Sequence, residues 1–544
     1  MSHHDRPRGF LALPSQLAER ARRTRDELCL IEAESGLVVT NGQLYEDARR
    51  LGAGLAALGV GAGDTVATML PHCLDTYRIW FGLAGLGALE VPVGTRYRGR
   101  MLDHIIGDSG ARVVIVDDGH LAEVARVLGE HALPHVRAVV VRGEGDLRTV
   151  GSTAVLRLSE VATDPAGEAE MREPMAHDLA MVLYTPGTTG PSKGVLVPWG
   201  QVHATVTGVF PDGTCAPGKV LYGPFPPNHI GGRLFAGLAI QYGIPAVIRD
   251  VFSASAYWAD VGRYGCTTTA LVSAMVSILL SAPERAGDEE NPLRDVLMNP
   301  LTPESETFRT RFGVRVCTDY NMTETSIPLH SGWDIDDWRS CGKVRPGPPG
   351  YEVRLVDERD IPVAEGEVGE LVCRTGEPWA MNAGYLGRPE ETATAWRNGW
   401  FHTGDAFRMD ARGRYYFVDR IKDAIRRRGE NVSSFEIERE VLDHPDVNEC
   451  AAIGVRSELG EEDIKVFVVR RPGSDLTAAA LLEHVRARCA DFMVPRYVEF
   501  LEELPRTEAT QKVKKSELRA RQDQTAVLAT PDQPSAGPAP MEER

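Results

Sequence analysis

A segment at residues 184–194, YTPGTTGPSKG, combines small, hydroxyl-bearing and cationic residues in a way that suits phosphate chemistry. Glycine lets the backbone approach a ligand closely, and successive N–H groups form a concavity that accepts anions. Threonine hydroxyls and the lysine ammonium add further donors. The residues that this interpretation selects are Thr185, Gly187, Thr188, Thr189, Gly190, Ser192 and Lys193. The same composition also fits an ordinary polar loop.

Four further segments carry side chains that suit a nucleotide and a metal ion. They are YNMTET at 320–325, GWFHTGD at 399–405, VDRIKDAIRRRGENVSSFEIE at 418–438 and LPRTEATQKVKK at 504–515. The Glu324 carboxylate suits a magnesium ion that also binds phosphate, and the acceptor-only Asp405 suits ribose hydroxyls. Taken alone, TET also fits a helix start, and Asp405 also fits a β-turn.

Alternating helix and strand patterns before about residue 145 must position these segments. NGQLYEDARRLGAGLAALGV has helical spacing with Asn41 as its expected N-cap, and the strand pattern DTVATML follows it. TYRIWFGLAGLGALEVPV and RMLDHIIGDSGARVVIVDD repeat this order, and KVLYGPF, IPAVIRD and CTTTALVSAMVSILL continue it. Strands that alternate with helices predict a parallel sheet covered on both faces.

The pattern changes after about residue 340, where YEVRLVDERDIPVAEGEVGELVCR predicts antiparallel strands in a β-rich subdomain. A compact α+β unit is expected from there to about residue 520. The first ten residues are polar, and QTAVLATPDQPSAGPAPMEER is rich in proline, alanine and polar residues. Both ends of the chain are therefore expected to be disordered.

Composition narrows the class of protein. The 544 residues exceed what one core accommodates, so about three or four folding units are expected. A net charge of −17 argues against a general nucleic-acid or membrane-surface binder. Nine scattered cysteines without a Cys-x-x-Cys pair predict free thiols in a reducing compartment. Because no signal-peptide pattern and no apolar run near the ~20 residues of a membrane span is found, a cytoplasmic protein is expected.

Together, in this order and spacing, the five segments resemble the motifs of the adenylate-forming superfamily of acyl- and aryl-CoA synthetases, luciferases and peptide-synthetase adenylation domains. The resemblance covers about residues 40–518, and RRRGENVSSFEIE is most similar to carnitine/crotonobetaine-type acid–CoA ligases. It implies an α/β fold: a large N-terminal domain of two doubly wound sheets plus a β-barrel-like subdomain, and a small mobile α+β C-terminal lid. The expected parts are a disordered N-terminus 1–10, the N-terminal adenylation domain 11–419 with its β-rich part at about 340–419, the lid 420–520 and a disordered tail 521–544.

The resemblance also implies a two-step reaction. A carboxylate attacks the α-phosphate of ATP to give acyl-AMP and pyrophosphate, and a thiol then displaces AMP. The implied ligands are ATP, magnesium, coenzyme A and a small carboxylic acid, with no nucleic acid or membrane as partner. Homodimers are common in the family, so a homodimer is a candidate assembly.

On this resemblance, the glycine-rich loop binds the β- and γ-phosphates, and Glu324 and Thr188 bind magnesium and act in catalysis. The other nucleotide contacts that the resemblance implies are Tyr320 beside adenine, Thr323 at the α-phosphate, and Asp405 and Arg420 at the ribose.

The acid and the thiol also have implied contacts. Lys512 bridges the carboxylate and the α-phosphate, and His229 lines the tunnel between acid and thiol, although a lone histidine is more often structural. Lys422 is the implied hinge, and Gly429 lies in a loop beside the pantetheine channel. The charge run Arg426–Arg428 fits either CoA phosphates or a solvated surface.

Several departures from the family pattern keep alternatives open. Pro186 replaces the usual loop serine, LMNPL at 297–301 replaces a small glycine-rich segment, and the last motif is one residue longer. Lys514 and Lys515 are therefore alternatives to Lys512. The acceptor is alternatively a carrier-protein thiol or an amine, or nitrite is activated for diazotisation. A regulator that binds an adenylate or acyl-CoA without chemistry is the third alternative.

The acid pocket is implied to lie around residues 229–234, 269–275, 298–300 and 321–327. Its mixed polar side chains favour a small polar or aromatic acid over a long fatty acid. Two roles are open for Arg233: it pairs with a second polar group of the substrate, or it forms a structural salt bridge.

Overall fold

The computed structural model describes residues 10–130, 133–144, 150, 153–162, 171–185, 192–420, 425–427, 430–432, 434–456, 462–489, 493–506, 513–520 and 527–528. The chain divides into two compact units. Unit 1 is Met1–Glu367, Leu371–Thr403 and Met409–Tyr416, and unit 2 is Val368–Glu370, Gly404–Arg408 and Phe417–Arg544. Within these described ranges, no helix is both long and apolar enough to cross a membrane.

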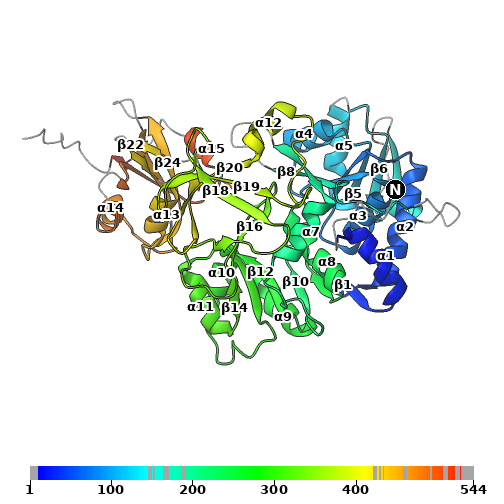
Figure 1. Cartoon of the computed structure of the whole chain (residues 1–544), viewed down its shortest axis with the longest axis horizontal. Helices are drawn as coiled ribbons and strands as arrows, with labels where there is room; N and C mark the ends of the chain where they lie inside the picture. Colours follow the sequence, from blue (N-terminus) through cyan, green and yellow to red (C-terminus); the bar gives the residue numbers. More distant parts are fainter. Residues whose placement is uncertain are drawn as a thin grey trace, which may run out of the picture. The chain divides into compact units, whose positions relative to one another are not determined.

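One seven-stranded sheet of unit 1 has the order β14-β13-β12-β10-β11-β1-β2 (Figure 1). All its neighbouring strands are parallel except β1 and β2. Its strands are β1 (Leu28–Glu32), β2 (Val38–Thr40), β10 (Leu221–Gly223), β11 (Ala246–Ile248), β12 (Thr268–Val272), β13 (Asp295–Asn299) and β14 (Arg315–Cys317). The accompanying helices are α1 (Leu13–Arg23), α8 (Ile230–Tyr242), α9 (Ala254–Tyr264), α10 (Ser273–Leu280) and α11 (Pro303–Phe312).

A second seven-stranded sheet has the order β7-β6-β5-β3-β4-β8-β9, with only β8 and β9 antiparallel. Its strands are β3 (Thr65–Met69), β4 (Leu89–Pro92), β5 (Val113–Asp117), β6 (Ala138–Arg142), β7 (Ala154–Arg157), β8 (Leu179–Thr185) and β9 (Lys193–Pro198). The accompanying helices are α2 (Asn41–Ala57), α3 (Leu74–Leu86), α4 (Gly99–Ser109), α5 (Leu121–Glu130), α6 (Leu158–Val161) and α7 (Trp199–Gly208).

Smaller sheets follow in the sequence. A three-stranded antiparallel sheet contains β15 (Asp319–Met322), β16 (Ser326–His330) and β17 (Lys343–Val344). The β subdomain has the order β18-β19-β20-β21, with β18 (Tyr351–Val356), β19 (Val368–Thr375), β20 (Phe401–Met409), β21 (Tyr415–Arg420) and the helix α12 (Pro389–Ala395). Unit 2 adds β22 (Ile425–Arg427), β23 (Glu430–Val432), α13 (Ser434–Leu442), β24 (Val447–Arg456), β25 (Glu462–Arg470), α14 (Ala478–Arg486), β26 (Tyr497–Leu501), α15 (Lys515–Ala520) and β27 (Val527–Leu528).

The α/β fold with two large sheets, a β subdomain and a small C-terminal unit is confirmed, with two local corrections. Each large sheet ends in an antiparallel edge strand, β2 or β9, whereas the alternation predicted parallel neighbours only. The N-cap of α2 is Thr40, not Asn41, because Thr40 and Gln43 form a reciprocal capping box. The side-chain Nδ2 atom of Asn41 instead donates to the Thr24 carbonyl at 3.0 Å.

Side chains from the two large sheets and their helices meet in one apolar core, within which a charged pair is enclosed. Trp80 of α3 stacks on Trp199 of α7 with ring centroids 5.0 Å apart. Next to Trp80, the Arg233 Nη2 atom lies 2.7 Å from the Glu90 Oε1 atom, and the two side chains are 1% and 0% exposed. Burial raises the pKa of Glu90, whereas Arg233 and a hydrogen bond from Thr68 lower it. This pair connects α8 of the first sheet layer to β4 of the second.

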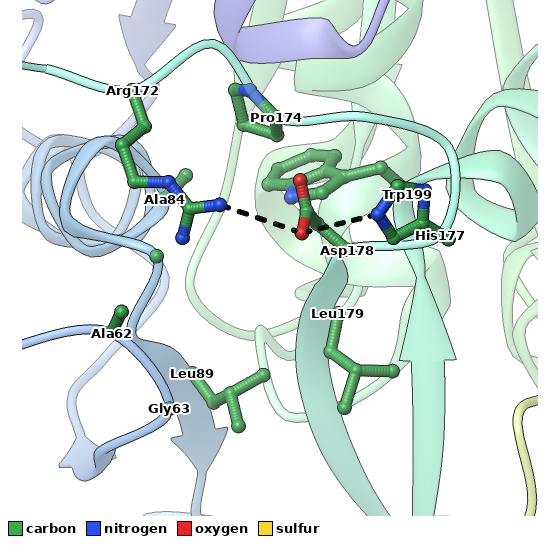
Figure 2. Close-up of a pocket in the computed structure, with 11 residues that line it drawn as sticks. Ala62, Gly63, Ala84, Leu89, Arg172, Pro174, His177, Asp178, Leu179 and Trp199 are labelled. Atoms are coloured by element: carbon green, nitrogen blue, oxygen red, sulfur yellow. Dashed lines mark ion pairs between the residues drawn. The ribbon is translucent and has the colours of Figure 1, made fainter. Parts of the chain in front are cut away.

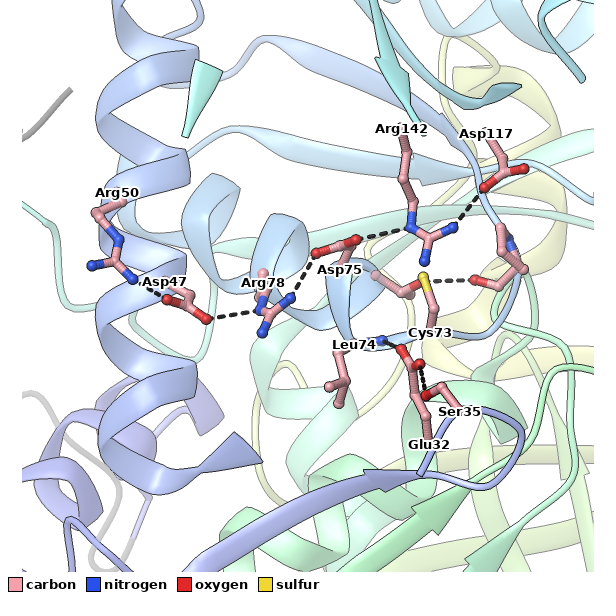
Figure 3. Close-up of polar contacts among 12 residues, drawn as sticks. Glu32, Ser35, Asp47, Arg50, Cys73, Leu74, Asp75, Arg78, Asp117 and Arg142 are labelled. Carbon is pink, nitrogen blue, oxygen red and sulfur yellow. Dashed lines mark hydrogen bonds and ion pairs between the residues drawn. The ribbon is translucent and has the colours of Figure 1, made fainter. Parts of the chain in front are cut away.

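A row of ion pairs joins helices α2 and α3 to the strands β5 and β6 (Figure 3). Asp47 binds Arg78 at 2.9 Å, and Arg78 also binds Asp75 at 2.9 Å. Asp75 continues to Arg142 at 2.8 Å, and Arg142 reaches Asp117 at 2.7 Å. All five side chains are partly exposed, so the contribution of each pair is small, at about 0–1 kcal/mol.

Candidate active site

Strands β8 and β9 hold the two ends of the predicted phosphate loop. Thr185, which is half-buried, and Lys193 lie opposite each other in the antiparallel pair. The loop residues Gly187, Thr188, Thr189 and Gly190 lie outside the described residues, so their roles remain predictions.

Helix α4 contacts the chain on both sides of this loop. The Tyr184 hydroxyl donates to the Asp108 Oδ2 atom at 2.7 Å. His104 donates from Nε2 to the Ser192 carbonyl at 2.8 Å, and its ring meets the Tyr184 ring edge-on. The two ends of the loop are therefore anchored to one helix.

Lys193 lies beside a second chain segment. Backbone hydrogen bonds join β9 to residues 383–386, so the Lys193 Nζ atom is 5.3 Å from the centroid of the Tyr385 ring. Lys193 also forms an ion pair with Glu391 of α12. The hydrogen bond from Lys193 lowers the pKa of the Glu391 carboxyl.

Residues 382–385 of the same segment also form hydrogen bonds with Glu324. Its carbonyl accepts hydrogen bonds from the Asn382 backbone N–H at 3.0 Å and from the Asn382 Nδ2 atom at 2.9 Å. The Tyr385 hydroxyl donates to the Glu324 Oε1 atom at 3.3 Å. Burial, together with the adjacent Glu324 carboxylate, raises the pKa of Tyr385. Tyr385 therefore contacts Lys193 with its ring and Glu324 with its hydroxyl.

The arrangement fits a triphosphate with magnesium better than a metal held by protein ligands alone. Glu324 is 8% exposed and offers oxygen, the donor that magnesium prefers. Among the described residues, no group of three or more His, Cys, Asp and Glu side chains could hold a metal ion. Magnesium is commonly bound by one or two carboxylates together with substrate phosphates and water. A single carboxylate whose neighbour Tyr385 also contacts Lys193 matches that requirement.

Tyr320 and Thr323 lie in the same region of the chain as Glu324. Tyr320 is half-buried in β15, where it pairs with Leu329 of β16. The Thr323 carbonyl accepts a hydrogen bond from the Gln201 Nε2 atom at 2.6 Å, which ties the turn to α7. Thr323 and Glu324 thus lie in the turn that directly follows the strand of Tyr320.

The residues expected around the acid have different surroundings. His229 is half-buried at the N-cap of α8. Arg233 forms an ion pair with Glu90. Of the two roles expected for this arginine, the structure therefore shows the structural salt bridge. Met298 is fully buried in a core cluster, and the neighbouring Asn299 donates to the Asp319 Oδ1 atom at 2.6 Å.

Two predicted ribose contacts meet in unit 2. The Asp405 Oδ1 atom lies 3.4 Å from the Arg420 Nε atom, and the side chains are 6% and 44% exposed. A mostly buried carboxylate beside a half-exposed guanidinium is suited to bind vicinal hydroxyls. Lys422 and Gly429 lie outside the described residues.

The two described lysines of the last motif have different partners. Lys515 lies 2.8 Å from the Glu438 Oε1 atom and donates to the Ser434 hydroxyl at 2.5 Å, and its side chain is 17% exposed. Lys514 pairs with Glu517 at 2.9 Å in the next turn. Lys512 lies outside the described residues. The role of Lys512 as the adenylation lysine therefore remains a prediction, with Lys514 and Lys515 as its alternatives.

Sequence reasoning missed Asn382, Tyr385 and Glu391. Their segment, MNAGYLGRPEE, carries one local signal, a proline followed by two acidic residues that predicts the start of a helix. That signal explains α12 but does not reveal which partners the segment meets, because Lys193 and Glu324 are distant in sequence.

A separate pocket of about 270 Å³ lies elsewhere in unit 1 (Figure 2). In Figure 2, Asp178 lies between Arg172 and His177, at 3.8 and 3.9 Å. The pocket shares no lining residue with the site around Tyr385.

Comparisons with known proteins show the family of the chain. Residues 17–386 match the model of the AMP-binding enzyme family, and residues 436–510 match its AMP-binding enzyme C-terminal domain. The crotonobetaine/carnitine–CoA ligase of Citrobacter koseri is 31% identical, over 90% of this chain and 95% of that protein. The sulfoacetate–CoA ligase of Cupriavidus necator is 31% identical, over 93% of this chain and 97% of that protein.

Solved structures show the same architecture. ATP-bound MatB from Rhodopseudomonas palustris is similar with a TM-score of 0.81 and 25% identity, covering 93% of this chain and 98% of that one. The anthranilate CoA ligase AuaEII in complex with anthranoyl-AMP has a TM-score of 0.83 at 24% identity, covering 96% and 99%. This second likeness supports the fold alone.

Proposed function

This chain belongs to the AMP-binding enzyme family and is an AMP-forming acid–CoA ligase, and we propose how its own residues carry out that reaction. The main observation behind the proposal is that Lys193 and Glu324 both contact the side chain of Tyr385. Phosphoryl and nucleotidyl transfer depend on fixed positive charge and on a metal ion at the phosphates. The three residues come from separate segments, and together they supply both requirements.

Lys193 binds the β- and γ-phosphates of ATP, with the backbone and hydroxyls of the loop between β8 and β9. Glu324 binds magnesium, which neutralises charge on the phosphates when it is present. The hydroxyl of Tyr385 holds the Glu324 carboxylate in one orientation. Asp405 and Arg420 bind the ribose, and Tyr320 stacks beside adenine.

In the first step, an oxygen of the acid forms a bond to the α-phosphorus, and the bond from that phosphorus to the bridging oxygen of pyrophosphate breaks. Lys512 stabilises the charge that develops on the acid and on the α-phosphate, and Thr323 donates to the α-phosphate. In the second step, the sulfur of CoA attacks the acyl carbon, and AMP leaves with the oxygen that came from the acid.

The acid is a small polar carboxylic acid. The names of the two relatives support this class, because crotonobetaine, carnitine and sulfoacetate are small acids that carry a second charged group. His229, which is half-buried at the N-cap of α8, is the residue that we propose to line the tunnel for this acid.

The test is AMP formation from ATP and magnesium with pooled small carboxylic acids, with and without CoA. The expected result is AMP that requires an acid and increases with CoA, after which the pools are divided to find the substrate. The variant Lys193→Met should lose this activity, whereas Lys343→Met, at an exposed lysine of β17, should keep it. If AMP formation requires an acid but does not increase with CoA, the acyl group is transferred to another acceptor. The absence of AMP with every pool would contradict the ligase assignment.

A further inference from the structure

The ion pair between Lys193 and Glu391 places a protein carboxylate on the residue that must bind phosphate. The two side chains are 34% and 38% exposed, so a soluble ligand can reach both. The lowered pKa of Glu391 keeps its carboxyl ionised at neutral pH, so the pair is charged on both sides. A lysine ammonium cannot give its full charge to two anions at once.

Glu391 is not an isolated surface charge. The Arg388 Nη1 atom donates to the Glu391 Oε1 atom at 3.2 Å, and the Arg388 Nη2 atom lies 3.6 Å from Asp108. Asp108 in turn accepts the hydrogen bond of Tyr184, at the start of the phosphate loop. A continuous row of polar contacts therefore connects the residue before the loop to Lys193 after it.

We propose that Glu391 is an internal anion that occupies Lys193 when no nucleotide is bound and competes with the β- and γ-phosphates for it. This inference rests on the proposed function, because it needs Lys193 to be a phosphate-binding residue. On binding of ATP, Lys193 leaves Glu391 for the phosphates. After adenylation, Glu391 takes Lys193 back as pyrophosphate leaves, which lowers the affinity for that product.

The competition has a predictable size. Partly exposed ion pairs contribute little, so removing this one should tighten binding of a β,γ-phosphate-bearing ligand by about two- to fivefold. AMP has no β- or γ-phosphate, so its affinity should not change. The difference should shrink at high ionic strength, because exposed charges are screened.

The experiment is calorimetric titration of the whole protein with magnesium–ATP, inorganic pyrophosphate and AMP. Glu391→Gln removes the charge, and Glu391→Asp keeps the charge but draws the carboxylate back from Lys193 by one methylene group. Glu390→Gln removes a charge from the neighbouring exposed residue of α12 and is the matched control.

Both Glu391 variants should bind magnesium–ATP and pyrophosphate more tightly than the unchanged protein and the Glu390→Gln control. The proposal is wrong if Glu391→Gln leaves these affinities unchanged or weakens them. It is also wrong if AMP binding tightens equally, or if Glu391→Asp behaves as the unchanged protein does, because net charge and not the contact would then be responsible. A protein that binds neither ATP nor AMP would contradict the proposed function instead.

Discussion

The buried pair of Glu90 and Arg233 should be essential for stability and not for substrate recognition. The Glu90 side chain is 0% exposed and that of Arg233 is 1% exposed, with 2.7 Å between the paired atoms. Arg233 also donates to the Thr76 carbonyl at 3.3 Å and lies over the Tyr77 and Trp80 rings. Removing one partner leaves the other as an uncompensated charge in the core.

The expected magnitude follows from this burial. Breaking a buried pair by removing one charge costs about 3–5 kcal/mol, whereas replacing both partners by apolar residues is about neutral or stabilising by 1–4 kcal/mol. Glu90→Leu and Arg233→Met should each therefore lower the free energy of unfolding by about 3–5 kcal/mol. The double variant Glu90→Leu/Arg233→Met should recover most of that loss, so the two substitutions should be strongly non-additive.

Urea unfolding followed by tryptophan fluorescence measures this, because Arg233 lies 5.2 Å from the Trp80 ring. The two single variants, the double variant and the unchanged protein form a double-mutant cycle. Losses below about 1 kcal/mol for both single variants, or additive losses, would refute the reasoning. A stable Arg233→Met variant with a greatly raised KM for the acid would instead identify Arg233 as a substrate-binding residue.

Three further predictions concern the nucleotide site and the pH dependence. Lys193→Met should lower kcat/KM for ATP by about 100-fold or more, measured as pyrophosphate release, with Lys343→Met within about twofold of the unchanged protein. Tyr385→Phe removes the hydrogen bond to Glu324, so the magnesium concentration for half-maximal activity should rise by about two- to tenfold; an unchanged magnesium titration would contradict that role. Burial lowers the pKa of His72 from 6.5 to about 3. As the pH falls, His72 is therefore protonated at a higher pH in the unfolded state than in the folded state. The protein should therefore lose stability relative to a His72→Gln variant as the pH falls below 6.5, by about 2 kcal/mol at pH 5 in urea unfolding; a pH-independent difference would refute this.

The sequence predicted the large sheets well because their strands are short apolar runs between helices of regular spacing. DTVATML contains the fully buried strand β3, and TYRIWFGLAGL lies within α3. The antiparallel edge strands were not predicted, since alternation reports which elements follow each other and not their direction. The sequence predicted Asn41 as the N-cap of α2, whereas the structure has Thr40 there. Both neighbouring residues are of a type that suits an N-cap, so the sequence alone did not distinguish them.

The candidate site was predicted only in part. Thr185 and Lys193 were predicted because their loop has a distinctive composition, and Glu324 was predicted because its segment resembles a motif of the family. The structure brings Lys193 and Glu324 to one side chain. Tyr385 and Glu391 were not found, because a tyrosine and a glutamate in a short loop and helix start have many ordinary uses. Their importance arises from backbone pairing between β9 and residues 383–386, a contact between segments far apart in sequence.

The most direct test of the central claim follows oxygen from the acid. The acid identified from the pools is labelled with ¹⁸O in its carboxylate and converted with ATP, magnesium and CoA, and the products are analysed by mass spectrometry. Because the acid attacks the α-phosphorus and the C–O bond breaks in the second step, AMP should carry one ¹⁸O atom and pyrophosphate none. Label in pyrophosphate or phosphate, or unlabelled AMP, would contradict formation of an acyl-adenylate at the site around Lys193 and Glu324.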